Sequence, residues 1–334
     1  MTHRRVAVLA GGRSSEHDVS LASAASVAEG LRTAGHAVTT IAIGRDGVWR
    51  RDGEPVQVAL GSPLPEVDVV FPVLHGPFGE DGTVQGLLEC LDMPYVGAGV
   101  LASALCMDKV RFKQLMAEAG VPQVDYRAIE EVDFAADPDR VARSVGELGY
   151  PLFVKPARLG SSVGIARVAG PAELEGALRT AFTHDSLAIA EALAEGREVE
   201  CSVLGNGSPI ASEPGEILLA AGESGWYDYE AKYTPGGMQL VVPARVAPEV
   251  RDRVRRLAVE TFSRAGCAGL ARVDFFVGHD GEVLVNELNT MPGFTETSVY
   301  GSLFTASGIP YPELLDRLVD LAIERHAAER AHQY

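Results

Sequence analysis

The chain has 334 residues, of which 46% are hydrophobic, 22% charged and 7% aromatic, a composition typical of a soluble globular protein with well-buried cores. Its formal net charge of −17 argues against nucleic acid or an acidic membrane as the main partner, because both repel a strongly negative surface. A nucleotide held in a local basic pocket is compatible with this charge.

The first hundred residues or so predict an open α/β domain. Buried strands are expected at residues 5–10, 36–43 and 67–74, and a helix at residues 18–33. Neither G-x-G-x-x-G nor G-x-x-x-x-G-K-[ST] occurs at the first turn, which disfavours a dehydrogenase.

The rest of the chain predicts α+β structure. Helices are expected at residues 108–120, 171–182, 248–266 and 311–326. Strands flank a glycine-rich loop in residues 150–168, and two more strands follow in residues 187–205. Residues 222–237 predict a long loop rich in glycine and aromatic residues, interpreted as a lid or, alternatively, a packed Ω-loop.

The cysteine pattern and the N-terminus indicate a cellular compartment. No two of the four cysteines form a C-x-x-C pair, so neither a zinc site nor a disulfide framework is indicated. The apolar run at residues 6–10 is too short for a signal peptide, and no segment reaches the length of a membrane span. We therefore expect a cytoplasmic protein with reduced thiols and no membrane partner.

Residues 270–288 predict a β-hairpin, because Asp-Gly at residues 280–281 is a strong turn signal. If those two residues centre the turn, Asp274 faces Glu287 and Arg272 faces Asn289 on one face of the hairpin.

The side chains on this face predict a magnesium site. Two neighbouring carboxylates repel each other unless a cation lies between them, and carboxylate and amide oxygens suit Mg²⁺. Alternation also places Val283 and Val285 on the same face as Glu287, which argues that the face is buried. The alternative is a solvated polar edge.

Other motifs are weaker alone. Lys155 precedes the loop Gly160–Gly164, which fits phosphate binding or an ordinary hairpin loop. Lys109, Glu16, His75, and the pair Glu191 and Glu198 each have a structural alternative as surface or strand-end residues. Ser298 lies at a predicted helix start, where a carboxylate binds well.

Taken together and in this order, the motifs resemble the D-alanine–D-alanine ligases of the ATP-grasp superfamily. The matching stretches span nearly the whole chain: GGRSSEHDVSL, LHGPFGEDGTVQG, GVLASALCMDK, VKPARLGSSVGI, YDYEAKY, RVDFF and NELNTMPGFTETS. The resemblance implies an ATP-grasp fold with an N-terminal open α/β (Rossmann-like) domain at residues 1–97. A central subdomain at 98–190 and a C-terminal subdomain at 191–334, with lid and metal site, would complete it.

The resemblance also implies a role for each matching residue. ATP would be held by Lys109, Lys155, Glu191, Ala192, Leu193, Glu198 and Lys232. Two Mg²⁺ ions, or Mn²⁺, would be bound by Asp274, Glu287 and Asn289. Glu16 would hold the ammonium of the first D-alanine in a set with Ser161 and Tyr233, and His75 would line that subsite. Arg272 and the backbone N–H of Gly293 would stabilise an oxyanion, and Ser298 and Val299 would contact the second D-alanine.

The implied reaction makes D-alanyl-D-alanine for peptidoglycan precursors through an acyl phosphate. The resemblance alone also implies a homodimer. Arg158, Glu296 and Gly301-Ser302 depart from the family pattern beside the substrate-binding stretches. One rival interpretation is a related ligase that makes D-Ala-D-lactate, D-Ala-D-Ser or a specialised amide, and Tyr233 disfavours the D-lactate product. Another is an inactive ATP-binding regulator.

Overall fold

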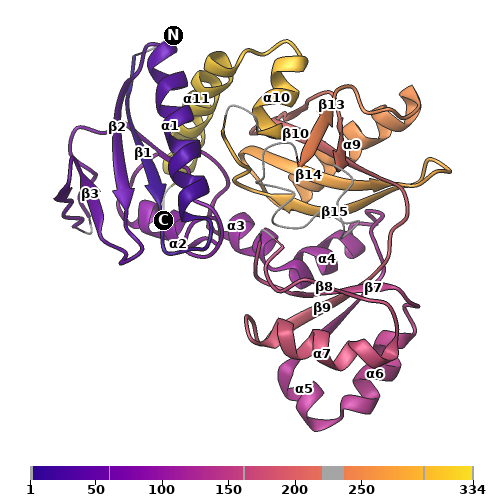
Figure 1. The fold of residues 1–334 in the computed structure, drawn as a ribbon. Helices are drawn as coiled ribbons and strands as arrows, with labels where there is room; N and C mark the ends of the chain where they lie inside the picture. Colours follow the sequence, from indigo (N-terminus) through magenta and orange to yellow (C-terminus); the bar gives the residue numbers. More distant parts are fainter. Residues whose placement is uncertain (1–2, 60, 161, 220–236, 296–297, 333–334) are drawn as a thin grey trace.

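The computed structural model describes residues 3–59, 61–160, 162–219, 237–295 and 298–332. Three β-sheets organise these residues (Figure 1): one at the N-terminal side, one in the lower part of the view, and one formed by the C-terminal half. The predicted residues Ser161, Lys232, Tyr233 and Glu296 and most of the predicted lid lie outside the described residues.

The first sheet has five strands in the order β4-β3-β2-β1-β5. Its central strands β1, β2 and β5 are parallel, as predicted for an open α/β domain. The strands are β1 (Arg5–Gly11), β2 (Ala37–Ile43), β3 (Trp49–Arg51), β4 (Glu54–Pro55) and β5 (Val69–Pro72). Side chains of β1 alternate between two cores: Val6 and Val8 pack with helix α1 (His17–Thr33), whereas Ala7 and Leu9 pack with helix α2 (Thr83–Cys90).

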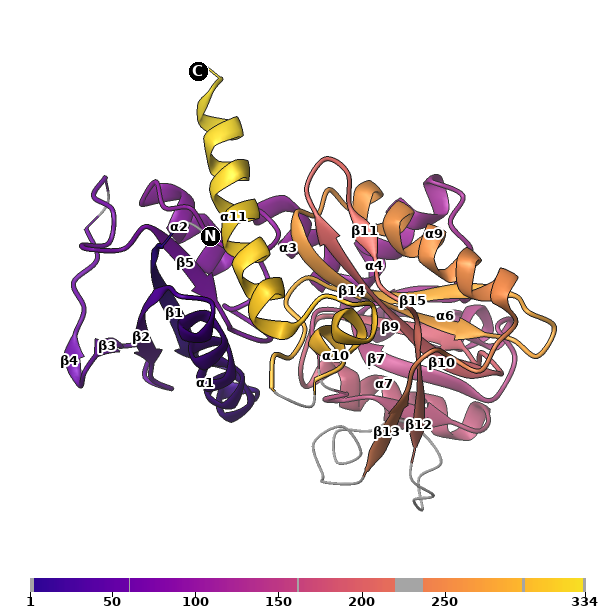
Figure 2. The ribbon, with the colours of Figure 1, turned by 90° about the horizontal axis from the view of Figure 1, so that it is seen from above.

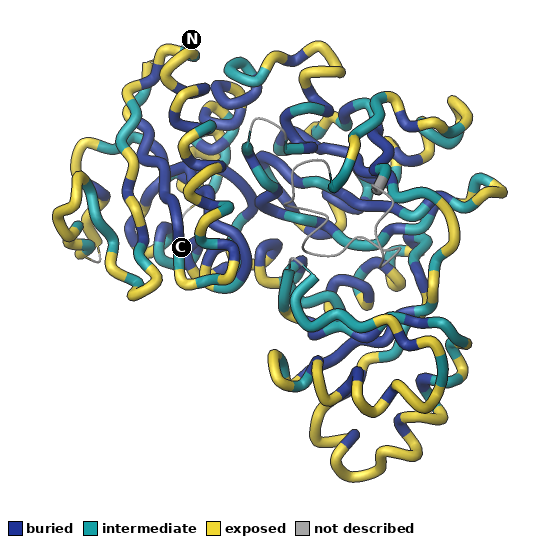
Figure 3. Tube along the Cα trace, viewed as in Figure 1, coloured by how far each residue is buried: buried dark blue, intermediate teal, exposed yellow. Residues whose placement is uncertain are grey.

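The second sheet has four antiparallel strands in the order β6-β9-β7-β8. They are β6 (Tyr126–Glu130), β7 (Leu152–Pro156), β8 (Ala166–Val168) and β9 (Leu187–Ala192). One face packs against α5 (Glu131–Ala136), α6 (Pro138–Gly146) and α7 (Pro171–Phe182). The outer turns of these helices are exposed (Figure 3). Because side chains alternate along a strand, Lys155 and Glu191 lie on the other face, where both line the cleft described below.

The third sheet has six strands, in the order β13-β12-β10-β14-β15 with β11 beside β10. They are β10 (Arg197–Gly205), β11 (Ile210–Ala211), β12 (Gly215–Leu219), β13 (Met238–Val241), β14 (Gly269–Val277) and β15 (Val283–Asn289). One face packs against α3 (Val100–Met107), α4 (Lys109–Glu118) and α9 (Pro248–Arg264). The β12–β13 hairpin projects from this sheet (Figure 2).

The last two helices connect the first and third sheets. Helix α10 (Val299–Ala306) packs near β10, and helix α11 (Tyr311–Arg330) lies beside α1 in the core of the first sheet (Figures 1 and 2). Leu314 and Leu318 of α11 are fully buried in this core with Val6 and Val8. The chain thus returns to its starting domain, and the expected boundary between residues 190 and 191 falls inside β9. Among the described residues, no helix is long and apolar enough to cross a membrane.

Candidate active site

A cleft of about 1410 Å³ lies between the second and third sheets and the loops after β1 and β5. Most of the residues predicted from the sequence line it: Glu16, His75, Lys109, Lys155, Glu191, Ala192, Leu193, Glu198, Arg272, Glu287, Asn289, Gly293, Ser298 and Val299. Residues that lie far apart in the sequence therefore meet in one cavity, which is the arrangement that a ligand-binding site requires.

The β14–β15 hairpin has the predicted pairs, but for a reason that the sequence does not reveal. Asp274 lies opposite Glu287 and Arg272 opposite Asn289, as predicted. Nearer the turn, however, Val277 pairs with Val283, so the turn is longer than two residues. A bulge between Asp274 and Phe275 restores the predicted register.

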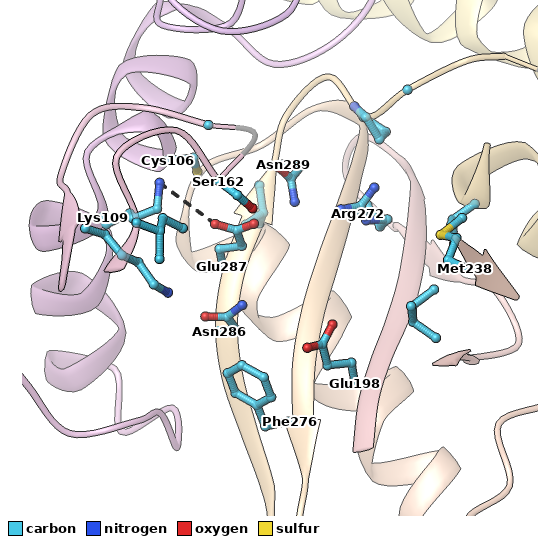
Figure 4. A pocket seen from close by; sticks show the side chains of 18 of the residues that line it. Cys106, Lys109, Ser162, Glu198, Met238, Arg272, Phe276, Asn286, Glu287 and Asn289 are labelled. Carbon is cyan, nitrogen blue, oxygen red and sulfur yellow. Dashed lines mark ion pairs between the residues drawn. The ribbon is translucent and has the colours of Figure 1, made fainter. Parts of the chain in front are cut away.

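The prediction that Val283 and Val285 share a face with Glu287 and Asn289 is wrong, because the bulge lies between the two pairs of residues. The two valines are fully buried in the core beneath the sheet, whereas Glu287 and Asn289 line the cleft. The extra residue, Asn286, also lines the cleft (Figure 4). Because one inserted residue reverses the alternation, the same strand supplies apolar side chains to the core and then polar side chains to the site.

Arg272, Asp274 and Asn289 form one hydrogen-bonded group. Arg272 donates from Nε to Oδ1 and from Nη2 to Oδ2 of Asp274, both at 2.7 Å. Asn289 Nδ2 donates to Asp274 Oδ2 at 3.0 Å. Arg272 Nε also lies 2.8 Å from Oε2 of Glu200, a buried residue of β10. The guanidinium is therefore fixed in the wall of the cleft before any ligand binds.

Glu191 joins two lysines at the second sheet. Its carboxylate oxygens lie 3.0 Å from Lys113 Nζ and 2.5 Å from Lys155 Nζ. Burial alone would raise the pKa of Glu191, but the two ammonium groups outweigh it and hold the pKa well below its usual range. Burial likewise opposes the charge of Lys155, yet Glu191 and more distant carboxylates raise the pKa of this lysine. Both groups are charged at neutral pH.

Lys109 connects the glycine-rich loop to the metal-site candidate. Its Nζ donates to the backbone oxygen of Leu159 at 2.6 Å and lies 3.9 Å from Glu287 Oε2 (Figure 4). Its position at the first residue of α4 follows from Asp108, whose side chain accepts from Arg111 N and caps the helix. Lys109 thus places positive charge on the side of the cleft opposite Arg272 (Figure 4), and Lys155 of β7 adds a second positive charge to the lining.

The N-terminal loops supply an acidic and imidazole-containing end of the cleft. A Cβ added to Gly160 would lie 3.6 Å from Glu16 Oε2, so the carboxylate is close to the glycine-rich loop. His75 Nδ1 lies 3.0 Å from the backbone oxygen of Met291, and burial lowers the pKa of the imidazole. Burial, followed by the charge of Glu16, raises the pKa of the neighbouring Glu80 to about 8.

The segment after β15 brings a backbone amide and a hydroxyl together. A Cβ added to Gly293 would lie 3.0 Å from Ser298 Oγ, so glycine allows this close approach. Ser298 precedes α10, as predicted, and its Oγ accepts from the backbone N of Thr295 at 2.8 Å. Gly301 and Ser302, which depart from the family pattern, lie within α10.

Several lining or supporting residues are absent from the sequence prediction: Glu80, Lys113, Arg197, Glu200, Glu216, Arg245 and Asn286. Lys113 follows Lys109 by one helical turn, and Glu200 follows Glu198 by the period of two, so spacing could have indicated both. Asn286 gave no signal, because its orientation depends on the bulge. Arg158, a predicted departure, binds Asp185 with its guanidinium and its backbone N.

The oxygen ligands of Asp274, Glu287 and Asn289 fit magnesium better than a metal that is bound by protein side chains alone. Within the part of the chain that the structure describes, no group of three or more His, Cys, Asp or Glu side chains could hold a metal ion. Asp274, Glu287 and Asn289 offer two carboxylates and an amide on one face. Mg²⁺ commonly takes one or two carboxylates and fills the remaining positions with water and substrate phosphates.

Comparison with known proteins identifies the family. The model of the D-ala D-ala ligase C-terminus matches residues 115–320, and that of the N-terminus matches residues 5–62 and 54–98. The D-alanine--D-alanine ligase of Deinococcus radiodurans is 48% identical, with 96% of this chain and 99% of that protein covered. D-alanine--D-alanine ligase A of Salmonella typhimurium is 41% identical, with 99% of each covered.

Solved structures agree with this assignment. The D-alanine-D-alanine ligase of Coxiella burnetii has a TM-score of 0.88 and 35% identity, covering 99% of this chain and 97% of that one. The VanG D-Ala:D-Ser ligase of Enterococcus faecalis has a TM-score of 0.86 and 37% identity, covering 96% and 100%. These likenesses confirm the predicted ATP-grasp fold with an open α/β N-terminal domain. This chain belongs to the D-alanine–D-alanine ligase family.

Proposed function

We propose that this chain joins two D-alanine molecules into D-alanyl-D-alanine, with ATP converted to ADP and phosphate, for peptidoglycan precursors. The observation that carries the proposal is the meeting, in one cleft, of Lys109 of α4 and Lys155 of β7 with Arg272, Glu287 and Asn289 of the β14–β15 hairpin. Phosphoryl transfer needs positive charge and positioning more than covalent chemistry from the protein, and this cleft supplies both.

ATP lies, in this proposal, between the second and third sheets. Lys155 and Lys109 neutralise its phosphates, as does Lys232. Glu198 accepts from the ribose, and the carboxylate of Glu191 keeps Lys155 in place. The backbone of Ala192 and Leu193, which line the same cleft, contacts the base.

Magnesium is the second proposed requirement, held by Asp274, Glu287 and Asn289. When bound, two such ions, or Mn²⁺, draw negative charge from the transferring phosphoryl group. The chain's own contribution is to keep these three side chains on one face of the hairpin, which the β15 bulge achieves.

The reaction proceeds in two steps. Glu16 holds the ammonium of the first D-alanine, with Ser161 and Tyr233, while His75 lines this subsite. The carboxylate of this D-alanine attacks the γ-phosphorus of ATP, which gives D-alanyl phosphate and ADP. The amine of the second D-alanine, whose carboxylate is held by Ser298 beside Val299, then attacks the acyl carbon. Arg272 and the Gly293 N–H stabilise the oxyanion that forms, before phosphate leaves.

D-serine is the second candidate acceptor, because the 37% identical VanG protein is named a D-Ala:D-Ser ligase. The two acceptors differ by one hydroxyl, and an apolar pocket discriminates only weakly against a ligand that merely adds a hydroxyl. Competition between D-alanine and D-serine, with mass analysis of the dipeptides, separates these candidates.

We further propose three domains at about the predicted limits, which are 1–97, 98–190 and 191–334. We also propose that the protein is a homodimer and that it is cytoplasmic. The separate apolar cores of the second and third sheets support the domain division, while α11 returns to the core of the first sheet. The use of ATP supports the location. Sedimentation of the purified protein tests the oligomeric state.

The primary test is ADP release by the purified protein with ATP and Mg²⁺, with and without D-alanine. D-alanine-dependent ADP together with a product of the mass of D-alanyl-D-alanine is the expected result. ADP release that does not depend on D-alanine, with no dipeptide, would refute the proposed function.

A further inference from the structure

Arg272 is held by carboxylates from two different strands. Asp274, two residues along β14, accepts hydrogen bonds from Nε and Nη2, while Glu200 Oε2 of β10 lies 2.8 Å from Nε as an ion pair. Glu200 lies directly opposite Asp274 in the β10–β14 pairing, so the two carboxylates enclose the guanidinium from adjacent strands. Arg272 lines the cleft, and Glu200 beside it is only 4% exposed.

The Asp274 carboxylate already accepts hydrogen bonds at both of its oxygens. It accepts three hydrogen bonds, two from Arg272 and one from Asn289 Nδ2, and a carboxylate has about four lone-pair sites. A cation that binds Asp274 therefore competes with Arg272 for the same oxygens. Glu200 holds Arg272 through an ion pair that this competition does not affect.

We propose that Glu200 is a positioning residue, which keeps the Arg272 guanidinium aimed into the cleft while the Asp274 carboxylate turns to a bound cation. The inference rests on the proposed ligase function, in which Arg272 stabilises the oxyanion of the second step. Loss of Glu200 then impairs amide formation more than phosphoryl transfer, because the first step does not use Arg272 in this way.

The kinetic signature is uncoupling. When the second step is slow, water attacks the acyl carbon or phosphorus of D-alanyl phosphate, and D-alanine and phosphate are released without dipeptide. The ratio of ADP to dipeptide, which is one in a coupled ligase, then rises. A carboxylate that only stabilises the fold would lower both products in parallel and leave the ratio unchanged.

Two variants test the role, with one matched control. Glu200→Leu keeps the volume and removes the acceptor, and Glu200→Gln keeps an acceptor oxygen without the charge. Glu213→Leu removes a more exposed carboxylate that also pairs with an arginine, 3.0 Å from Arg251 Nη1 and outside the cleft. Loss of the Glu200 ion pair at the largely buried Arg272 guanidinium predicts that Glu200→Leu lowers dipeptide kcat about tenfold or more, with the KM for ATP changed less than about threefold.

We expect the ADP-to-dipeptide ratio to rise above one in Glu200→Leu, to be partly restored in Glu200→Gln, and to stay at one in Glu213→Leu. A ratio of one in both Glu200 variants would overturn the proposal. If Glu200→Leu fails to fold, as judged by thermal unfolding, Glu200→Gln decides between these outcomes.

A second readout does not depend on activity. Crystal structures of the wild-type protein with ADP and Mg²⁺ should keep Arg272 Nε within hydrogen-bond distance of Glu200, and in Glu200→Gln the guanidinium should be less ordered or displaced. An Arg272 that leaves Glu200 when Mg²⁺ binds would contradict the proposal. A wild-type protein that forms no dipeptide would instead defeat the ligase function, and the crystal structures would still decide the positioning of Arg272.

Discussion

Glu191→Gln should substantially destabilise the protein, although it changes no volume. The side chains of Glu191, Lys113 and Lys155 are only 6%, 1% and 14% exposed, so the substitution leaves two buried ammonium groups without their shared partner. Breaking a buried ion pair typically costs about 3–5 kcal/mol. Other carboxylates act on Lys155, and Lys113 Nζ lies 5.7 Å from the Tyr126 ring centroid, so we expect the lower end of this range.

The assay is urea unfolding at pH 7, with Glu213→Gln as the control. Glu213 and Arg251 form a more exposed pair, whose loss should cost less than about 1 kcal/mol. Replacing Lys113 by Met in the Glu191→Gln background should recover part of the stability, because one unpaired charge is then removed. A Glu191→Gln protein as stable as the control would refute the reasoning that burial makes this triad costly to break.

Three further outcomes are expected. Glu287→Gln should lower turnover at saturating Mg²⁺ about a hundredfold or more, measured by ADP release across a Mg²⁺ titration, and near-normal rates would contradict its metal role. Hydrogen bonds from Arg245 and then Arg197 lower the pKa of Glu216 from 4.5 to about 2, so its stabilisation is present above pH 4.5 and lost as pH falls toward 2. Glu216→Gln should therefore cost about 2 kcal/mol in urea unfolding at pH 7, a difference that narrows in acid; a pH-independent difference would count against this pairing. Asn286 lines the cleft between Lys109 and Glu198, two residues proposed to bind ATP (Figure 4), so Asn286→Leu should raise the KM for ATP with little change in kcat; an unchanged KM would show that the amide does not contact the nucleotide.

Helices with a clear apolar stripe could be predicted from the sequence. Phe112 and Met116 of α4 lie in the core as their spacing predicts, and α9 begins at Pro248 as expected. Helix α3 could not be predicted in the same way, because VLASALCM has no polar face that would mark a helical period.

The site shows a similar division. The pairing of Asp274 with Glu287 follows from a local turn signal, but the longer turn and the bulge compensate each other, and neither is encoded in the alternation of side chains. The ion pairs of Lys113 with Glu191 and of Arg272 with Glu200 depend on which strands become neighbours. Strand order is a property of the whole chain, so local patterns predict the residue types in the cleft better than their partners.

The return of α11 to the first sheet has a consequence for biosynthesis. The sheet core that begins with Val6 and Val8 is completed by Leu314, Leu318 and Val319, which the ribosome adds only after the strands of the second and third sheets. Until then, the nascent first sheet exposes the apolar face that α11 covers. Synthesis of α11 therefore completes this core, and a product truncated before residue 311 would expose that face and be prone to aggregate.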